Sequence, residues 1–448
     1  MSAFAATLPG TAPAAIMSLA DPQRERARRT VVRLVFTAYV LLVLEGALRK
    51  WALEPIHKVI FFIRDPFVAL SLYLCVRHRL MECTPLVLVV LVFSVLFIFL
   101  GGYHIIAYNL NPITVVFGWR SYFYYLFFAL VMAAVLRRAD VERMIRWSLL
   151  MAAPMAVLAF IQWRSPTDAW VNRQIGGGEV FTVAQGVVRT SGTFTFTSGF
   201  VCFVGATLAC LGAAAFTRTI PRWVVALGAA GGATCLATSG ARMAIMYAAV
   251  TGLMAFACET VRPLAQQRLA VHAGVLVMTV GLVLGLVVVY PDALDLMAER
   301  SQIASEQEDS GHRLLFTFLA GFVVGEEAGL LGQGMGAGSG GGSTVATGHQ
   351  SFTMAEDEFP RVVLETGLIG GLGYMALRFT LSGWLLWRSV RCVRERQDAI
   401  PLLLCSFTVP MLMAAQLTLQ GSINGYGWIF TGLTLAAIHT SEECRASA

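Results

Sequence analysis

Long apolar blocks recur along almost the whole of this 448-residue chain, and they limit what it can fold into more than any other feature. Leu86–Leu100 and Val275–Tyr290, for example, contain no charged residue. A helix of about 20 apolar residues spans the roughly 30 Å hydrocarbon core of a bilayer. Only 13% of the residues are charged, compared with roughly 25% in soluble domains. The sequence therefore predicts an all-α, polytopic membrane bundle.

The apolar blocks predict about 12 transmembrane helices within a membrane domain at 31–440. The predicted spans are 31–50, 56–76, 84–101, 113–136, 145–163, 193–215, 222–239, 243–260, 271–290, 361–387, 400–418 and 423–439. The largest outside loop, 291–360, lies between helices 9 and 10, and a shorter one covers 164–192. We expect 1–30 to be a disordered tail and 441–448 to be a short C-terminal tail.

The basic residues predict the orientation, because Lys and Arg concentrate in cytoplasmic loops. With the N-terminus inside, the cytoplasmic loops and both tails hold 20 of the 33 basic residues, whereas the outside loop 291–360 holds only Arg300 and Arg313. We therefore expect both tails to be cytoplasmic. The basic residues recur between apolar blocks and do not form one stripe, so a nucleic-acid partner is not expected.

Several ionisable side chains fall inside the apolar spans, where each costs roughly 2.5–3.5 kcal/mol and is a candidate functional group. Glu45 and Arg49 lie four residues apart on one helical face and are expected to pair. Arg64 and Asp65 fall in the second span, and Arg120 falls in the fourth. Two interpretations are open for these residues: ion pairs between helices that hold the bundle together, or a functional site.

Arg242 is predicted to lie in a tight hairpin, Ala237–Arg242, between the seventh and eighth spans at the outer membrane face. Its guanidinium offers five N–H donors in a planar arrangement that suits a phosphate group. The alternative is an arginine whose head group simply reaches the interface.

Three features of the large outside loop need an explanation. Arg313 and His349 are candidate functional residues, although each is also an ordinary residue type for a loop. Glu356, Asp357 and Glu358 precede the tenth span, where acidic residues favour a helix N-terminus. The glycine-rich run 332–342 follows no predicted strand and no GK[ST] comes after it, so it predicts a mobile loop rather than a phosphate-binding motif.

Four segments of the chain resemble the superfamily of O-antigen ligases and Wzy-type O-antigen or exopolysaccharide polymerases. They are Arg189–Phe194 (RTSGTF), Thr238–Arg242 (TSGAR), Arg313 followed by Gly332–Gly336 (GQGMG), and Glu365–Gly370 (ETGLIG). Together they cover roughly residues 185–375, and the first half of the chain is similar in topology alone.

The resemblance implies a metal-independent glycosyltransferase of the GT-C type in the bacterial inner membrane, without a cofactor. Its substrate would be an oligosaccharide linked to undecaprenyl diphosphate, and chain-length regulators and export proteins would be its partners. Arg242 and Arg313 would hold the diphosphate, because two guanidinium groups can neutralise the charge of this leaving group. Arg189, Arg120 and Glu365 would contact sugar or lipid.

The sequence departs from the family pattern at the general base, which accepts a proton from the acceptor hydroxyl. The ligases have a histidine about nine residues before the glutamate that corresponds to Glu365, and this chain has Glu356 there, followed by Asp357. His349 lies seven residues earlier. The base is therefore Glu356, with Asp357 beside it, or His349. The missing histidine favours a polymerase over a ligase.

A third hypothesis comes from another class, a secondary transporter or flippase. Transporters tend to have internal repeats and charged or broken helices near the membrane midplane. The sequence has no convincing repeat, and its candidate residues collect at the predicted outer face. The leading hypothesis is therefore a polymerase of lipid-linked polysaccharide repeat units.

Overall fold

Helices make up nearly all of the described chain. The structure, a computed structural model, describes residues 22–175, 180, 182, 188–217, 219–261, 320–339, 341–342, 354–355 and 357–446. The elements are α1 (Pro22–Ala47), η1 (Leu48–Ala52), η2 (Glu54–Ile56), α2 (His57–Ile60), α3 (Asp65–Arg77), α4 (Pro85–Tyr108), α5 (Pro112–Trp119), η3 (Arg120–Tyr124), α6 (Tyr125–Val135), α7 (Arg138–Arg164), η4 (Trp170–Asn172), α8 (Thr197–Ala215), α9 (Arg222–Thr238), α10 (Arg242–Val261), α14 (Gly325–Ala328), α16 (Glu358–Arg396), α17 (Ile400–Ala414) and α18 (Gly421–Ala446). The predicted all-α, polytopic bundle is confirmed.

Eight helical segments in the described part are long and apolar enough to cross a membrane. They coincide with the predicted spans one to six, eight and ten, and α9, α17 and α18 coincide with spans seven, eleven and twelve. The ninth predicted span, 271–290, lies outside the described residues. The chain is therefore a membrane protein of many helices.

Both tails are shorter than predicted. α1 begins at Pro22, inside the predicted tail 1–30, and α18 continues to Ala446. Ion pairs explain the early start of α1, because Glu25 pairs with Arg28 and Arg29, three and four residues ahead, at 3.1 and 2.9 Å. Pairs at this spacing stabilise an exposed helical turn.

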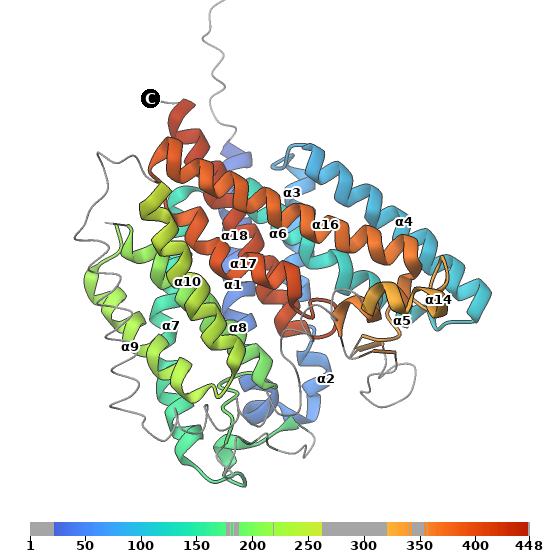
Figure 1. Cartoon of the computed structure of the whole chain (residues 1–448), viewed down its shortest axis with the longest axis horizontal. Coiled ribbons are helices and arrows are strands. Elements are labelled where there is room, and N and C mark those ends of the chain that lie inside the picture. Colours follow the sequence, from blue (N-terminus) through green and yellow to red (C-terminus); the bar gives the residue numbers. More distant parts are fainter. Residues whose placement is uncertain are drawn as a thin grey trace, which may run out of the picture.

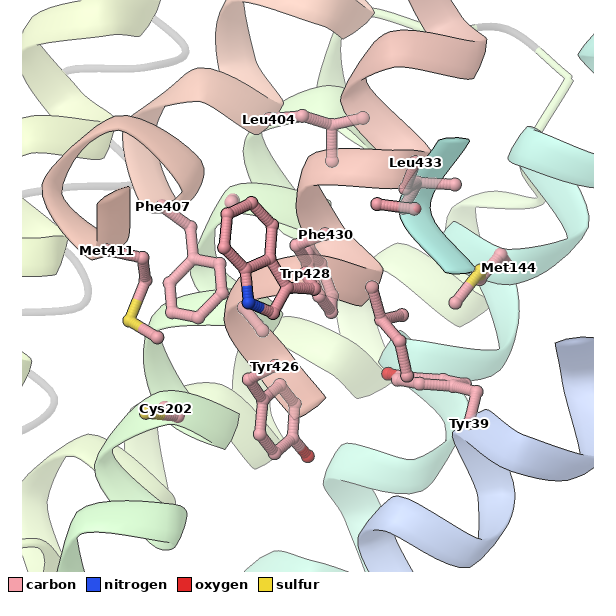
Figure 2. Packing of buried hydrophobic residues seen from close by; sticks show 14 of the residues in the cluster. Tyr39, Met144, Cys202, Leu404, Phe407, Met411, Tyr426, Trp428, Phe430 and Leu433 are labelled. Atoms are coloured by element: carbon pink, nitrogen blue, oxygen red, sulfur yellow. The ribbon is translucent and has the colours of Figure 1, made fainter. Parts of the chain in front are cut away.

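The core is built around α17 and α18, in the middle of the molecule (Figure 1). Their aromatic rings pack edge to face, with 5.1 Å between the ring centres of Phe407 and Phe430. Trp428 is buried beside them and Tyr39 contributes from α1 (Figure 2). Small residues allow close helix approach elsewhere: a Cβ at Gly231 of α9 would lie 2.7 Å from the backbone of Ala152 in α7. Such contacts hold helices together in lipid.

The helix α4 lies at one edge of the molecule (Figure 1) and exposes large apolar side chains along its length. Thr84 caps its start, with its hydroxyl accepting from the N–H of Val87 at 3.4 Å, and Asn109 ends it in a left-handed conformation. Phe99 and Ile106 are 72% and 86% exposed. Such a surface suits a helix that faces lipid.

The described loops that are predicted to be cytoplasmic lie together at one end of the bundle, called the basic end below. There Arg24 of α1 donates to the carbonyl of Arg79 at 3.0 Å, and Arg28 donates to the carbonyl of Val135 at 3.0 Å. Arg138 at the start of α7 forms an ion pair with Asp398, just before α17. Each long helix has one terminus at the basic end. The candidate motifs lie at the other termini of these helices, and therefore on the opposite side of the bundle.

A reversal of the chain within α16 is the main departure from a simple bundle. Gly367 has φ 76° and ψ 176°, a conformation that is not helical and is essentially restricted to glycine. Residues before and after it run side by side, since a Cβ at Gly371 would lie 2.7 Å from the Cα of Val363, and the Phe359 and Phe379 rings are 5.4 Å apart. α16 is therefore a short helix folded back on a long one, and the predicted tenth span contains this hairpin.

Candidate functional site

The first ion pair, which is partly buried, joins α3 to η3, a π-helical turn. The Nε and Nη2 atoms of Arg120 donate to the two carboxylate oxygens of Asp65 at 2.7 and 2.8 Å. The hydroxyl of Tyr125 donates to the same carboxylate at 3.0 Å. π-Helical turns are rare and tend to occur at functional positions. Here the turn places Arg120 so that the two N–H groups on one edge of its guanidinium meet one carboxylate.

A second buried cluster surrounds Glu45 of α1. Its carboxylate pairs with Arg49 at 3.3 Å, the spacing expected from the sequence, and with Arg64 at 2.8 Å. Arg64 is fully buried and also donates to the carbonyl of Gly421 at 3.2 Å. Ion pairs between helices therefore join Glu45 to Arg64 and Asp65 to Arg120, as one of the two interpretations predicts, whereas the Glu45–Arg49 pair lies within one helical segment.

Lys50 is a buried cation for which the described residues offer no carboxylate partner. It lies in η1, a second π-helical turn, and is 1% exposed. Its ammonium donates to the hydroxyl of Ser191 at 3.1 Å and to the carbonyl of Gly192 at 2.8 Å. Lys50 thus fixes the Arg189–Phe194 segment against the end of α1.

The segments Arg189–Phe194 and Thr238–Arg242 lie against each other. The hydroxyl of Thr190 donates to the carbonyl of Thr238 at 2.8 Å, and both residues are buried. Arg242 begins α10 directly after the predicted hairpin and is exposed. Arg189 is partly buried. These two motifs therefore meet at the end of α9 and α10 that lies opposite the basic end.

The segments Gly332–Gly336 and Glu365–Gly370 form a second pair. The carboxylate of Glu365, which is fully buried, accepts from the N–H groups of Gly336 and Gly338 at 3.1 and 2.9 Å. It also accepts from the hydroxyl of Tyr122 at 2.8 Å. The described part of the glycine run is thus a packed element, not the mobile loop that its composition predicts.

This packed loop also satisfies the backbone groups that the reversal at Gly367 leaves without helical partners. The N–H groups of Leu368 and Ile369 donate to the carbonyls of Gly329 and Leu330 at 3.0 and 3.3 Å. In the other direction, the N–H of Gln333 donates to the carbonyl of Leu364 at 2.8 Å. Irregular backbone at membrane depth needs such partners within the protein.

A third charged cluster lies inside the α16 hairpin. Glu358 forms ion pairs with Arg361 and, at 2.9 Å, with Arg378. Its carboxylate also accepts from the N–H of Thr418 at 3.1 Å. All three charged side chains are at most 2% exposed. Instead of facing water at a helix start, Glu358 is the shared anion of two buried arginines.

The turn between α17 and α18, residues 415–420, is where the second and third charged clusters come close together. Arg361 and Glu358 contact Thr418, Arg378 donates to the carbonyl of Ala415 at 2.9 Å, and Arg64 reaches Gly421 directly after the turn. Ser198 of α8 bonds Gln420. Side chains from three separate parts of the chain therefore converge on one buried turn.

Cations outnumber carboxylates within these buried and partly buried clusters, although two further carboxylates, Asp140 and Glu259, are buried elsewhere in the described residues. Six cationic side chains and four carboxylates make up the clusters in the described residues: Arg49, Lys50, Arg64, Arg120, Arg361 and Arg378 against Glu45, Asp65, Glu358 and Glu365. Buried charges are costly unless they are paired. An excess of positive charge in such a place suits an anionic ligand.

The predicted site residues fall into two groups. Arg313, His349 and Glu356 lie outside the described residues. Arg189 and Arg242 lie in the two motifs that contact each other through Thr190 and Thr238. Glu365 lies in the other pair of motifs. Arg120 forms its ion pair with Asp65. Asp357 is the N-cap of α16, and its side chain makes no capping hydrogen bond. The prediction that these residues form one site is therefore untested.

Sequence reasoning missed Lys50, Arg361, Arg378 and Tyr122. The sequence does contain a signal for Arg378, because this residue lies in the middle of the predicted span 361–387. A charged residue at such a position is by itself a candidate functional residue. Arg361 stands at the first position of that span and looks like an interfacial arginine. Lys50 ends the first span and looks the same. Their burial depends on tertiary structure.

No model of a known protein family matches this chain, and no curated protein matches it. Within the described residues, no three His, Cys, Asp or Glu side chains come together as metal ligands would. The requirement for a metal is therefore a question for experiment.

Proposed function

We propose that this chain polymerises polysaccharide repeat units that are linked to undecaprenyl diphosphate, at the periplasmic face of the bacterial inner membrane. The observation that carries the proposal is the packing of the resembling segments. Arg189–Phe194 contacts Thr238–Arg242, and Gly332–Gly336 contacts Glu365–Gly370. Segments that supply one active site are expected to meet in this way, and both pairs lie away from the basic end.

In the proposed reaction, a hydroxyl oxygen of the acceptor sugar attacks the anomeric carbon of the donor glycan. The bond from that carbon to the diphosphate oxygen breaks, and undecaprenyl diphosphate leaves with the electron pair. Arg242 and Arg313 neutralise its growing negative charge, which lowers the barrier as a divalent cation does elsewhere. The hydroxyl proton passes to a base, Glu356 or His349, with Asp357 as the neighbouring carboxylate.

Cations outnumber carboxylates within these clusters, which supports an anionic substrate of this kind. Lys50 and Arg361 each have a buried cationic head group whose hydrogen-bonding capacity is only partly used. A lipid-linked diphosphate enters from the bilayer, so cations near the outer end of the bundle would attract it. The basic end would face the cytoplasm, with both termini there.

The test is incubation of the purified protein with lipid-linked repeat units, with and without a chelator. A ladder of products that a chelator does not change is the expected result. Absence of elongation, or complete loss with chelator, would contradict the metal-independent polymerase. Glu356→Gln, His349→Ala and Asp357→Asn then identify the base, which is the residue whose loss removes turnover without weakening donor binding.

A ligase that transfers glycan to lipid A core is the nearest alternative. A strain that lacks the gene separates the two activities. Loss of a polymerase leaves single repeat units on the cell surface, whereas loss of a ligase leaves none and polymer accumulates on the lipid carrier.

One structural observation favours a transporter or flippase as a second candidate. The helix break at Gly367 lies beside buried charged residues, and broken helices with charges are typical of transporter substrate sites. Reconstitution in liposomes distinguishes the classes. A flippase moves intact lipid-linked units across the bilayer, and a polymerase changes their length on one side.

A further inference from the structure

His104 of α4 is a buried histidine that bonds the packed glycine segment through both of its ring nitrogens. Its side chain is fully buried. The N–H of Met335 donates to Nδ1 at 3.0 Å, and Nε2 lies 2.8 Å from the carbonyl oxygen of Leu331. One imidazole therefore contacts the Gly332–Gly336 motif at both ends, at the residue before it and at the fourth residue within it.

These two partners fix the protonation state of the imidazole. A carbonyl oxygen can only accept, so Nε2 carries a proton and donates it to Leu331. A backbone N–H can only donate, so Nδ1 accepts from Met335 through its lone pair. An imidazolium has a proton on both nitrogens and would direct an N–H at the N–H of Met335. The observed contacts therefore require neutral His104.

The surroundings of His104 provide no charge that would stabilise an imidazolium. α5 contains no charged residue. The described elements of this region bring two phenols and three carboxylates: Tyr103, Tyr108, Glu326, Glu327 and Glu365. The phenol rings lie 5.7 and 5.8 Å from the imidazole centre, the two carboxylates of α14 are exposed, and Glu365 bonds Gly336 and Gly338. None of the three carboxylates forms an ion pair with His104, so an imidazolium there would be buried without a counter-charge.

The glycine segment fits against α4 and α5 without space for a small shift. A Cβ at Gly101 of α4 would lie 2.8 Å from the side chain of Met335, and a Cβ at Gly118 of α5 would lie 2.8 Å from the backbone of Gly336. Met335 is itself fully buried. Repulsion between an imidazolium and the N–H of Met335 would therefore displace the segment as a whole.

We propose that His104 is a positioning residue of the polymerase: in its neutral form it holds the Gly332–Gly336 motif in place, and its protonation releases that motif. Glu365 fixes the motif from α16 and His104 fixes it from α4, so both contacts are needed to keep the second pair of motifs together. The effect on catalysis rests on the proposed function, whereas the release on protonation does not.

Hydrogen exchange at the N–H of Met335 tests the release, in the full-length protein in detergent and with correction for the intrinsic exchange rate at each pH. Protection should be constant above about pH 7.5. It should fall by up to about tenfold per pH unit below about pH 6.5, where a histidine that has lost its partners takes up a proton. The sign follows because the folded segment binds the neutral form alone. Wild-type protection that does not change between about pH 8 and about pH 5 overturns the proposal.

His104→Asn is the variant that isolates the proton, because asparagine keeps an acceptor oxygen for Met335 and does not titrate. Its protection should be independent of pH, and a slope as steep as that of wild type overturns the proposal. His104→Gln serves if the asparagine variant does not fold. His57→Asn is the matched control, since Nδ1 of His57 lies 2.9 Å from the carbonyl oxygen of Glu54 and donates there in either protonation state. This control should keep the wild-type profile, and a flat profile would contradict the assignment to His104.

Polymerisation of lipid-linked units measures the positioning role separately. The ratio of the His104→Asn rate to the wild-type rate should rise by up to about tenfold per pH unit below about pH 6.5. A purely structural histidine would leave this ratio constant, and the titration of the general base cancels in it. If units are polymerised and the ratio is constant, the function stands and the positioning role is wrong. If nothing is polymerised but exchange at Met335 follows the predicted profile, the release on protonation stands in a protein with another function.

Discussion

Glu358 and Arg378 form an ion pair at 2.9 Å, although 20 residues separate them within α16. On a straight helix, 20 residues at 1.5 Å each would place them about 30 Å apart. The reversal at Gly367 brings them together, and with them the buried arginines and the turn between α17 and α18. The candidate site therefore depends on the conformation of one glycine.

Gly367→Ala should destabilise the protein by about 2 kcal/mol or more. The backbone conformation of Gly367 costs a residue with a side chain roughly 1–3 kcal/mol, and the added methyl would also collide with the carbonyl of Leu330. Gly383 is the control, because it lies on the same helix with nothing within 4 Å of its Cβ position. Gly383→Ala should stabilise by about 0.5–1 kcal/mol. Unfolding in detergent measures both, and equal effects would contradict the hairpin.

Asp65→Asn should cost about 3–5 kcal/mol of stability. The substitution leaves the Arg120 guanidinium buried without its bidentate partner, and breaking one side of a buried pair has an effect of this size. Glu395→Gln is the control, since Glu395 and Arg391 form an exposed pair four residues apart at 2.9 Å. Its loss should cost less than about 0.5 kcal/mol. Similar losses from the two variants would show that the Asp65 pair is not a structural anchor.

Much of the bundle could be predicted from the sequence because a spanning helix needs only local composition. The pair Glu45–Arg49 was predictable for the same reason, since a helix fixes which side chains are neighbours at a spacing of four. The partner of Glu358 was not, because the span 361–387 has the length and composition of one straight helix, on which Arg378 would lie far from Glu358, and glycine is common in membrane helices. Nothing near Gly367 in the sequence predicts a reversal. The packing of Gly332–Gly338 was also missed, because it depends on Glu365 and Tyr122, which lie far away along the chain.

Glu365→Gln should loosen the packed glycine segment. A glutamine side chain has one acceptor oxygen, so it cannot accept from Gly336, Gly338 and Tyr122 as the carboxylate does. At least one backbone N–H then loses its buried partner. Hydrogen exchange at Gly336 and Gly338 should become faster by roughly tenfold, as expected for a loss of about 1–3 kcal/mol.

Tyr122→Phe is the control for that variant, because it removes the hydroxyl donor and leaves both backbone hydrogen bonds to Glu365 in place. Exchange at the two glycines should then stay within about threefold of wild type. Faster exchange in Tyr122→Phe than in Glu365→Gln would mean that the tyrosine, not the carboxylate, holds the segment.

Arg242→Ala should abolish polymer formation and leave folding unchanged. Arg242 is exposed and has no hydrogen bond or ion pair with the described residues, so its removal should alter stability by no more than about 0.5 kcal/mol. Arg313→Ala is predicted to have the same effect on polymer. Arg222 is the matched control, since it is also an exposed arginine that begins a helix, but at the basic end. Chain length is read from the glycan ladder of complemented cells. Normal chain length with Arg242→Ala, or equal loss with Arg222→Ala, would remove Arg242 from the site, because a general loss of positive charge would then explain the result.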